Sequence, residues 1–326
     1  MTLTVVGAGA WGTALACVLR HNGHAVRVWG HDAATLEALA RDRVHARALP
    51  GVSLPVDIEF QPDLQAALKG ADGVVVAVPS AVLRRVAHGM RGFGGLVVSA
   101  TKGIEATTGL TMSGILEQVM PGTVTAALSG PSLALEVARG VPTAVVAAAG
   151  DASVARRVQG WFHRASFRVY TSTDLTGVEL GGALKNVIAI AAGVCDGLGF
   201  GDNSKAALVT RGQAEVRRLG MACGARGETF AGLSGLGDLM VTCFSRLSRN
   251  RSFGEKLGQG GRVRELLVSA TSVVEGHPCA LSAHELAVRL GVDAPIIREV
   301  HGMLYEDKEP LRAVQDLLGR DTKAED

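Results

Sequence analysis

A glycine-rich hexapeptide, Gly7-Ala8-Gly9-Ala10-Trp11-Gly12, follows the first apolar run of the chain and constrains its fold more than any other feature. The run from Thr2 to Val6 predicts a strand, and the residues after the hexapeptide predict a helix that ends near Asn22. In this setting Gly7 permits a tight turn, Gly9 lets a pyrophosphate approach the backbone, and Gly12 permits close helix–strand packing. We therefore expect a dinucleotide-binding unit; the alternative is a glycine-rich turn without a ligand.

Short β-branched runs alternate with helical stretches through the first half of the chain. Several of these runs are continuously apolar, which is typical of parallel strands covered by helices on both faces. We expect strands at 2–6, 25–29, 73–78, 96–100, 124–128, 143–148 and 167–171. The fold class that follows is α/β, with a Rossmann-like, doubly wound, mostly parallel sheet.

The pattern changes after Thr171. Thr176 and Glu179 have the spacing of a capping box. The apolar period that follows predicts a strongly amphipathic helix, with Leu180, Leu184, Val187, Ile188, Ala191 and Val194 on its apolar face. Few strand signals follow, so we expect an all-α C-terminal domain. A chain of 326 residues exceeds the length at which a single hydrophobic core stops growing, so two domains are expected. We predict a dinucleotide-binding domain at 1–175 and a helical substrate-binding and catalytic domain at 176–326.

Composition excludes several classes of protein. With 47% hydrophobic and 20% charged residues the chain is not disordered, and a net charge of +2 argues against nucleic acid or an anionic membrane as a partner. The five cysteines are dispersed and show no C-x-x-C pattern, so we expect a reducing compartment and no metal site. The N-terminus lacks the pattern of a signal peptide, and no uninterrupted apolar run reaches about 18 residues. These features predict a soluble, cytoplasmic protein.

The end of the second expected strand bears on the choice of cofactor. Asp32 stands 20 residues after Gly12, the spacing of an acid that binds the ribose 2′-hydroxyl of NAD. Asp32 nevertheless lies beyond the strand end, and His31 could instead face the 2′-phosphate of NADP. Both dinucleotides stay open at this point.

Two of the seven lysines lie in glycine-rich or apolar settings. Lys102 follows an expected strand, at the carboxyl edge where open α/β sheets bind ligands. Lys185 lies within the long apolar helix, where Gly181 and Gly182 are expected to leave room around it. A desolvated ammonium has a lowered pKa and can act in proton transfer. The alternative for each is a lysine whose stem packs on apolar surface while its charge reaches water.

Asp238 is a carboxylate in an apolar stretch punctuated by glycine. It is expected either to cap a helix or to orient a lysine and keep it charged away from water. Gly130 and Ser132, around Pro131, follow another strand end and could bring backbone N–H groups and a hydroxyl to a ligand.

Ser248, Arg249 and Asn250 stand in consecutive positions ahead of a segment that is expected to be helical up to Gly258. A hydroxyl, a guanidinium fork and an amide at a helix N-terminus suit the oxygens of a phosphate group. The alternative is a solvated, arginine-rich helix start.

Together these motifs resemble the bacterial biosynthetic NAD(P)-dependent glycerol-3-phosphate dehydrogenases, nearly from end to end. The matching stretches are GAGAWGTALA and VWGHD near the N-terminus, AVPS at 77–80, ATKGIE at 100–105, SGPS at 129–132, the long segment from 177 to 212, TFAGLSGLGDLMVTC from 229, SRNRSFG from 248 and VVEG from 273. The resemblance implies an enzyme that reduces dihydroxyacetone phosphate to sn-glycerol 3-phosphate with NAD(P)H for phospholipid synthesis. It also implies a cytosolic homodimer.

The resemblance assigns roles to residues at matching positions. It makes Lys185 the general acid/base, with Lys102 and Asp238 beside it. The implied substrate site comprises Lys102, Gly130, Ser132, Lys185, Asp238, Ser248, Arg249 and Asn250. The implied dinucleotide site adds Ala10, Trp11, His31, Lys102, Ala134, Arg249, Val273 and Glu275 to the glycine fingerprint and Asp32.

The chain departs from the family at two places. Leu133 and Leu135 replace the usual Phe and Lys after the Gly-Pro-Ser turn, and His277-Pro278-Cys279 follows VVEG, where Pro278 could alter a helix start. Two other functions are weighed against the implied one. A related two-domain dehydrogenase for another small hydroxy acid would have no need of the Ser-Arg-Asn sequence. A non-catalytic dinucleotide sensor would have no need of Lys102, Lys185 and Asp238.

Overall fold

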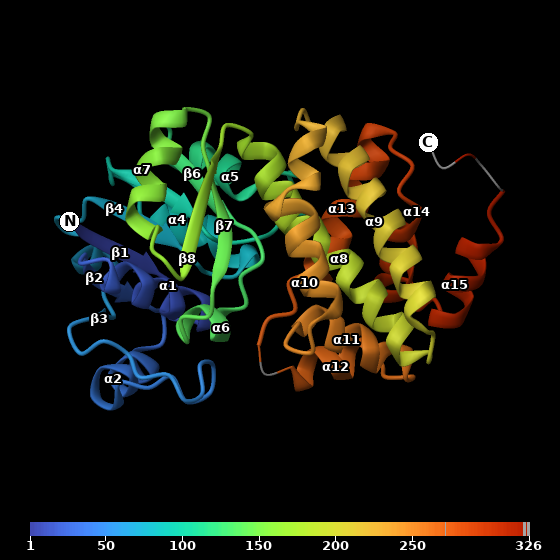
Figure 1. The fold of residues 1–326 in the computed structure, drawn as a ribbon, viewed down its shortest axis with the longest axis horizontal. Coiled ribbons are helices and arrows are strands. Elements are labelled where there is room, and N and C mark those ends of the chain that lie inside the picture. The colour runs from blue at the N-terminus through green and yellow to red at the C-terminus, as the bar shows by residue number, and fades with distance from the viewer. Residues whose placement is uncertain (271, 322–323, 325–326) are drawn as a thin grey trace.

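The computed structural model describes residues 1–270, 272–321 and 324, and it consists of an α/β region followed by a helical region (Figure 1). The strands are β1 (Thr2–Val6), β2 (Ala25–Trp29), β3 (Glu59–Gln61), β4 (Gly73–Val76), β5 (Leu96–Ser99), β6 (Thr125–Ser129), β7 (Thr143–Ala148) and β8 (Phe167–Ser172). The helices of the α/β region are α1 (Ala10–His21), α2 (Ala33–Asp42), α3 (Leu64–Leu68), α4 (Ser80–Gly89), α5 (Met112–Val119), α6 (Ala134–Ala138) and α7 (Ala152–Phe162). The helical region contains α8 (Leu175–Gly197), α9 (Asp202–Ala222), the 3₁₀ helix η1 (Gly227–Ala231), the π-helix η2 (Leu233–Gly237), α10 (Asp238–Phe244), α11 (Arg249–Gly258), α12 (Val263–Ser269), α13 (Gly276–Leu290), α14 (Pro295–Tyr305) and α15 (Pro310–Leu318).

All eight strands form one sheet in the order β3-β2-β1-β4-β5-β6-β7-β8. Every pairing is parallel except that of β6 with β7, so the doubly wound, mostly parallel sheet is confirmed. The edge strand β3, which pairs with β2, was not expected from the sequence. Its three residues, Glu-Phe-Gln, are too few and too polar to form an apolar run.

Helices cover both faces of the sheet. One face packs against α1, α6 and α7, and the other against α3, α4 and α5. The second face continues into the helical region, because Val178 of α8 packs against Ala127 of β6 and Val146 of β7. The two regions therefore share a packed boundary along β6 and β7.

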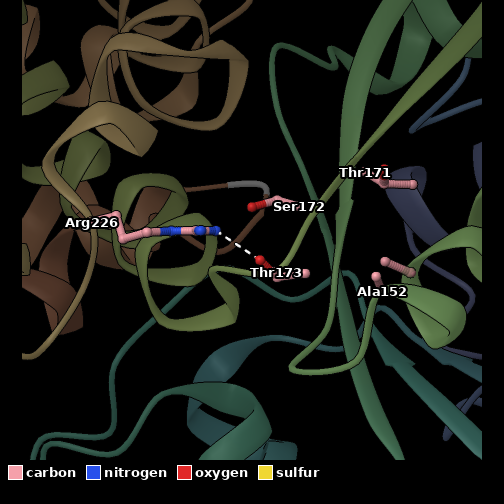
Figure 2. A pocket seen from close by; sticks show the side chains of 6 residues that line it. Ala152, Thr171, Ser172, Thr173 and Arg226 are labelled. Carbon is pink, nitrogen blue, oxygen red and sulfur yellow. Dashed lines mark hydrogen bonds between the residues drawn. The ribbon is translucent and has the colours of Figure 1, made fainter.

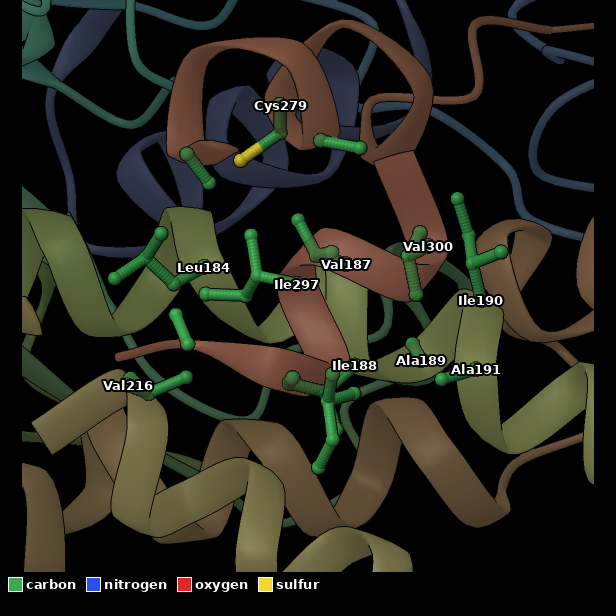
Figure 3. Close-up of a cluster of buried hydrophobic side chains, with 14 of the residues drawn as sticks. Leu184, Val187, Ile188, Ala189, Ile190, Ala191, Val216, Cys279, Ile297 and Val300 are labelled. Atoms are coloured by element: carbon green, nitrogen blue, oxygen red, sulfur yellow. The ribbon is translucent and has the colours of Figure 1, made fainter. Parts of the chain in front are cut away.

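Helix α8 is the centre of the helical region, where α9, α10, α11, α13 and α14 pack around it (Figure 1). Ile188 and Val187 lie in one apolar cluster with Val216, Ile297 and Val300 from the surrounding helices (Figure 3). The expectation of an amphipathic helix is wrong, since residues 177–195 are buried on every side. By length and composition α8 could cross a membrane, but the apolar window concerned is completely buried, as in the core helix of a globular protein.

The expected capping box at the start of α8 is also wrong. Asp174 is the N-cap, and its carboxylate accepts a hydrogen bond of 3.0 Å from the backbone N–H of Gly177. Glu179 points away from this end and binds Ser113 of α5. Strand β8 ends at Ser172 and α8 begins at Leu175, so the predicted division after residue 175 falls one residue inside α8.

Candidate functional site

Four strands end at the same edge of the sheet, and each is followed by a segment that the sequence had marked. The glycine loop follows β1, Ser80 follows β4, Lys102 follows β5 and Gly130 follows β6. The strand order reverses between β1 and β4. A crevice at such a reversal, outside the carboxyl ends of the strands, is where doubly wound folds bind their ligands.

The glycine loop has the shape that a dinucleotide requires. Gly7 has φ +127°, and a Cβ there would lie 2.6 Å from the carbonyl oxygen of Ala77. A Cβ on Gly12 would overlap the carbonyl of Gly7, whereas one on Gly9 would meet nothing within 4 Å. Gly9 is the N-cap of α1 and supplies no side-chain cap to the helix N-terminus. This open helix start fits a pyrophosphate group.

Ala10 and Trp11 form the first turn of α1, next to this open space. The indole Nε1 of Trp11 is buried and has no hydrogen-bond partner among the described residues. An unpaired buried donor is costly in a folded protein, which is consistent with a ligand group at this position.

Asp32 and His31 lie past the end of β2 and are both exposed. Asp32 is the N-cap residue of α2, and its carboxylate accepts a hydrogen bond from the hydroxyl of Thr35. Asp32 therefore stays close to the strand end, although part of its hydrogen-bonding capacity goes to its own helix.

Lys102, Lys185 and Asp238 come together, although they are far apart in the sequence. Lys185 donates to Oδ1 of Asp238, and Lys102 donates to Oδ2 over 2.5 Å. The Asp238 side chain is 1% exposed, that of Lys185 9% and that of Lys102 17%. Lys102 also donates to the carbonyl oxygen of Gly130 over 3.1 Å. One carboxylate thus holds two ammonium groups, one from each region of the chain.

Thr242 completes the surroundings of Lys185, and it was not among the site residues expected from the sequence. Its hydroxyl accepts from Lys185 Nζ over 2.7 Å and donates to the carbonyl oxygen of Asp238 over 2.6 Å. Thr242 lies four residues after Asp238 on α10, a spacing that places the two side chains on one helix face. This spacing is the feature of the sequence from which Thr242 could have been predicted as a site residue.

Burial controls the protonation of Lys185. Desolvation lowers its pKa to about 8, the negative charge of Asp238 opposes the shift, and the nearby charge of Lys102 adds to it. A lysine with a pKa near neutral pH can release a proton and regain it during a reaction.

The glycines beside Lys185 leave room for other groups than the sequence suggested. A Cβ on Gly182 would lie 2.4 Å from the hydroxyl of Ser129 and 3.6 Å from the Lys102 side chain. A Cβ on Gly181 would lie 2.7 Å from the carbonyl oxygen of Ser234. The two glycines therefore admit the Ser129 hydroxyl and the turn that leads to Asp238. The hydroxyl of Ser129 is buried without a partner among the described residues, and it was also not foreseen.

At the Gly-Pro-Ser turn, the carbonyl oxygen of Gly130 accepts the hydrogen bond from Lys102 over 3.1 Å. This carbonyl also accepts from the hydroxyl of Ser132 over 2.9 Å. Ser132 and Lys102 therefore donate to the same carbonyl oxygen.

The Ser-Arg-Asn sequence starts α11, but its three side chains are not equally available. Ser248 is the N-cap, and its hydroxyl accepts from the N–H of Arg251 over 3.2 Å. Asn250 is buried, donates to Asn186 Oδ1 over 2.8 Å and accepts from the N–H of Gly276 over 2.9 Å. Arg249 is exposed in the first turn. The predicted three-part phosphate clamp is thus one exposed guanidinium on a helix start that its neighbours hold in place.

Two further expected dinucleotide contacts, Glu275 and Ala134, lie at the same edge. Glu275 accepts from the hydroxyl of Ser80 over 2.5 Å and from its N–H over 3.2 Å. Burial raises the pKa of Glu275, while the bonds from Ser80 and the charge of Arg249 oppose that shift. Ala134 is the first residue of α6, and Val273 is 43% exposed.

The segments that depart from the family pattern are accommodated locally. Leu133 is the N-cap residue of α6, and Leu135 packs against the core of the α/β region. Helix α13 starts at Gly276, so Pro278 lies in its first turn, where a proline N–H is not needed. Pro278 and His277 line a cavity of about 510 Å³ together with Val273, and Cys279 donates to the carbonyl of Ala183 over 3.2 Å.

A second cavity, of about 270 Å³, lies between α7, the end of β8 and Arg226 (Figure 2). Arg226 donates to the hydroxyl of Thr173 there, over 3.0 Å. Because β7 runs antiparallel to β6 and β8 follows β7, this cavity lies at the opposite edge of the sheet from Lys102. Within the described part of the chain, no group of three or more His, Cys, Asp or Glu residues is arranged to hold a metal ion.

Known proteins resemble this chain over nearly its whole length. Models for the N-terminus and the C-terminus of NAD-dependent glycerol-3-phosphate dehydrogenase match residues 2–155 and 174–315. Glycerol-3-phosphate dehydrogenase [NAD(P)+] of Geobacter sulfurreducens is 49% identical, over 98% of this chain and 98% of its own. The enzyme of that name from Halorhodospira halophila is 48% identical, over 99% and 98%. The crystal structure of glycerol-3-phosphate dehydrogenase from Coxiella burnetii superposes with a TM-score of 0.94 at 37% identity, covering 98% of this chain and 99% of that one.

Proposed function

Because the chain belongs to the NAD-dependent glycerol-3-phosphate dehydrogenase family, we propose that it reduces dihydroxyacetone phosphate to sn-glycerol 3-phosphate with NAD(P)H. The product supplies glycerophospholipid synthesis. The observation that carries the proposal is the pairing of Lys102 and Lys185 on Asp238, at the edge of the sheet where the glycine loop also lies.

The dinucleotide is held by the glycine loop and the first turn of α1, with Ala10 and Trp11 beside it. Asp32 or His31 contacts the adenosine ribose, and Lys102, Ala134, Arg249, Val273 and Glu275 line the remainder of the site. When bound, the reduced nicotinamide supplies a hydride.

Lys185 is the general acid. As the C2 carbonyl becomes an alcohol, negative charge grows on its oxygen, and Lys185 gives that oxygen a proton. The ammonium group of Lys102 stabilises the oxygen, because a fixed cation in a closed site acts more strongly than one in water. Asp238 holds both ammonium groups in place, and Thr242 fixes the direction of Lys185.

The phosphate of the substrate is bound by Arg249 at the N-terminus of α11. A guanidinium fork matches two phosphate oxygens, and the helix start adds a partial positive charge. Ser248 and Asn250 hold this helix start in place through their own hydrogen bonds. Gly130 accepts hydrogen bonds from Lys102 and Ser132, and we place both Gly130 and Ser132 next to the substrate, beside Lys102. Binding energy at the phosphate positions the reacting carbonyl.

A spectrophotometric assay tests this function directly. Oxidation of NADH and NADPH is followed with dihydroxyacetone phosphate, and the control reactions contain small keto acids in its place. Turnover that depends on dihydroxyacetone phosphate supports the proposal. Turnover of another keto acid alone would identify a different dehydrogenase, and dinucleotide binding without turnover would identify a sensor.

We also propose a dinucleotide-binding domain at 1–175, a catalytic domain at 176–326, a homodimer and a cytoplasmic location. The change from sheet to helices between Ser172 and Leu175 supports the division. The five free cysteines support a reducing compartment. The sequence resemblance described above supports the dimer.

A further inference from the structure

Lys102 lies in a long connection between β5 and α5, residues 100–111, which we term the Lys102 loop. At its start, the hydroxyl of Thr101 donates to the carbonyl oxygen of Val78 over 2.7 Å. Farther on, Ile104 and Thr111 form an antiparallel bridge that closes the loop on itself. The loop therefore has a defined shape, and its placement depends on what holds its outer end.

Arg84 of α4 binds Glu105 of the loop over 2.7 Å, and the helical region adds two further contacts at this outer end. Glu179 of α8 accepts a hydrogen bond from the N–H of Ser113 over 2.8 Å and another from the Ser113 hydroxyl. Ser282 of α13 donates to the carbonyl oxygen of Ile104 over 2.9 Å. Both contacts cross from the helical region to the α/β region.

The surroundings of Glu179 suit a residue that fixes the start of α5. It is 6% exposed, and its carboxyl group lies at the N-terminus of α5, where free N–H groups favour an acceptor. It lies on the same helix as Lys185, six residues before it. Helix α8 is thus linked to both ends of the Lys102 loop: Glu179 binds Ser113, which lies two residues past the loop in α5, and Lys185 shares Asp238 of α10 with Lys102.

We propose that Glu179 is a positioning residue, which holds the Lys102 loop against α8 so that Lys102 stays beside Lys185 at the reacting carbonyl. The inference rests on the proposed function, because it concerns the place of Lys102 in that reaction. Without Glu179 the loop keeps its hydrogen bonds at Thr101 and Ile104, but the start of α5, into which it leads, loses its bonds to α8 at Ser113. The hydrogen bond between Lys102 and Asp238 is then formed for a smaller fraction of the time.

The chemistry of the contact indicates which substitutions preserve it. Burial raises the pKa of Glu179, and the bonds from Ser113 oppose that shift. The Ser113 N–H needs an acceptor, whereas the Ser113 hydroxyl can bind either an acceptor or a donor. The contact therefore needs a polar side chain of this length but not a net charge. Glu179→Gln can still accept from the Ser113 N–H, and its amide can donate to the hydroxyl, whereas Glu179→Asp is one methylene too short.

Glu215 provides a matched control for a buried glutamate that caps a helix. Its carboxylate accepts from the N–H of Ile296 over 2.8 Å and from that of Ile297 over 3.2 Å, at the start of α14. Burial raises its pKa to about 7. Glu215→Ala removes a cap of the same kind entirely within the helical region.

The test is a double-mutant cycle on kcat/KM for dihydroxyacetone phosphate. Glu179→Ala and Glu215→Ala are each made in the natural chain and in a Lys102→Ala background. We expect Glu179→Ala to lower kcat/KM about tenfold in the natural chain and less than about threefold in the background, because coupled residues lose their effect together. Glu215→Ala should change kcat/KM by the same factor in both backgrounds.

Equal factors for Glu179→Ala in the two backgrounds would overturn the inference and leave a simple helix cap. If Glu179→Ala does not fold, the cycle is run with Glu179→Asp, and Glu179→Gln should restore most of the lost kcat/KM. If Lys102→Ala alone has no effect on kcat/KM, the proposed role of Lys102 fails. Amide hydrogen exchange then decides on the loop: Glu179→Ala should speed exchange at 100–111 and not at 296–305, and unchanged exchange at 100–111 would refute the anchor.

Discussion

Lys102 and Lys185 come from different regions of the chain and bind different oxygens of the single Asp238 carboxylate. Two ammonium groups side by side would repel each other, and the negative charge of the shared carboxylate offsets this repulsion. The arrangement also makes the two lysines unequal. Lys185 is the more deeply buried, and its pKa is lowered to about 8.

The pH dependence of the reaction should follow this pKa. Reduction needs Lys185 with its proton, so the rate should be highest below about pH 8 and fall as the pH rises through that value. Oxidation of glycerol 3-phosphate needs the neutral amine and should show the opposite limb. Asp238→Asn removes the charge that opposes the lowered pKa, so the limb should move to lower pH. The measurement is kcat against pH in both directions, and a limb that stays in place in Asp238→Asn would contradict the assignment.

Arg249→Lys should raise the KM for dihydroxyacetone phosphate about tenfold, because a point charge does not replace a bidentate guanidinium. The control is Arg246→Lys, an exposed arginine just before α11. Thermal unfolding should be unchanged in both variants. An unaltered KM in Arg249→Lys would place the phosphate elsewhere.

The fold was largely predictable because continuously apolar strands and a glycine loop are local signals. Long-range contacts were not. The spacing of Thr176 and Glu179 suggested a local cap, whereas the partner of Glu179 is Ser113, 66 residues earlier in the chain. The apolar period of α8 indicated one buried face, whereas all faces are buried. The sequence does not reveal that other helices cover the remaining faces.

The lysines and Asp238 of the site stood out because charged residues are unusual in apolar surroundings. Thr242 and Ser129 are small and common in any setting, so only their contacts distinguish them.

Asp32→Ala should shift the cofactor preference from NADH toward NADPH, since an unpaired carboxylate repels a 2′-phosphate. Because Asp32 also binds Thr35 at the start of α2, Thr35→Ala is the control for damage to that helix. The ratio of kcat/KM for the two dinucleotides is measured in each variant. If the ratio is the same in Asp32→Ala as in the natural chain, His31 becomes the residue to test.

Close packing of α11 on α8 should be essential for stability. A Cβ on Gly254 would lie 2.0 Å from the carbonyl oxygen of Ile190, so Gly254→Ala should destabilise the protein by about 1–3 kcal/mol. Gly160 lies exposed in α7 and a Cβ there meets nothing within 4 Å, so Gly160→Ala should stabilise by roughly 0.5–1 kcal/mol. Denaturant unfolding measures both. A Gly254→Ala variant as stable as the natural chain would show that the helices can separate without cost.

The most direct test of the account is the turnover of Lys185→Ala. Loss of the acid and of its charge should lower kcat by roughly 10²- to 10⁴-fold, while the Kd of NADH and the unfolding temperature barely change. Lys185→Arg should restore little, because a guanidinium keeps its proton at any working pH. Combined with Asp238→Asn, the loss should be less than additive, since the two residues act as a unit. A kcat close to that of the natural chain in Lys185→Ala would contradict the account and transfer the role of proton donor to Lys102.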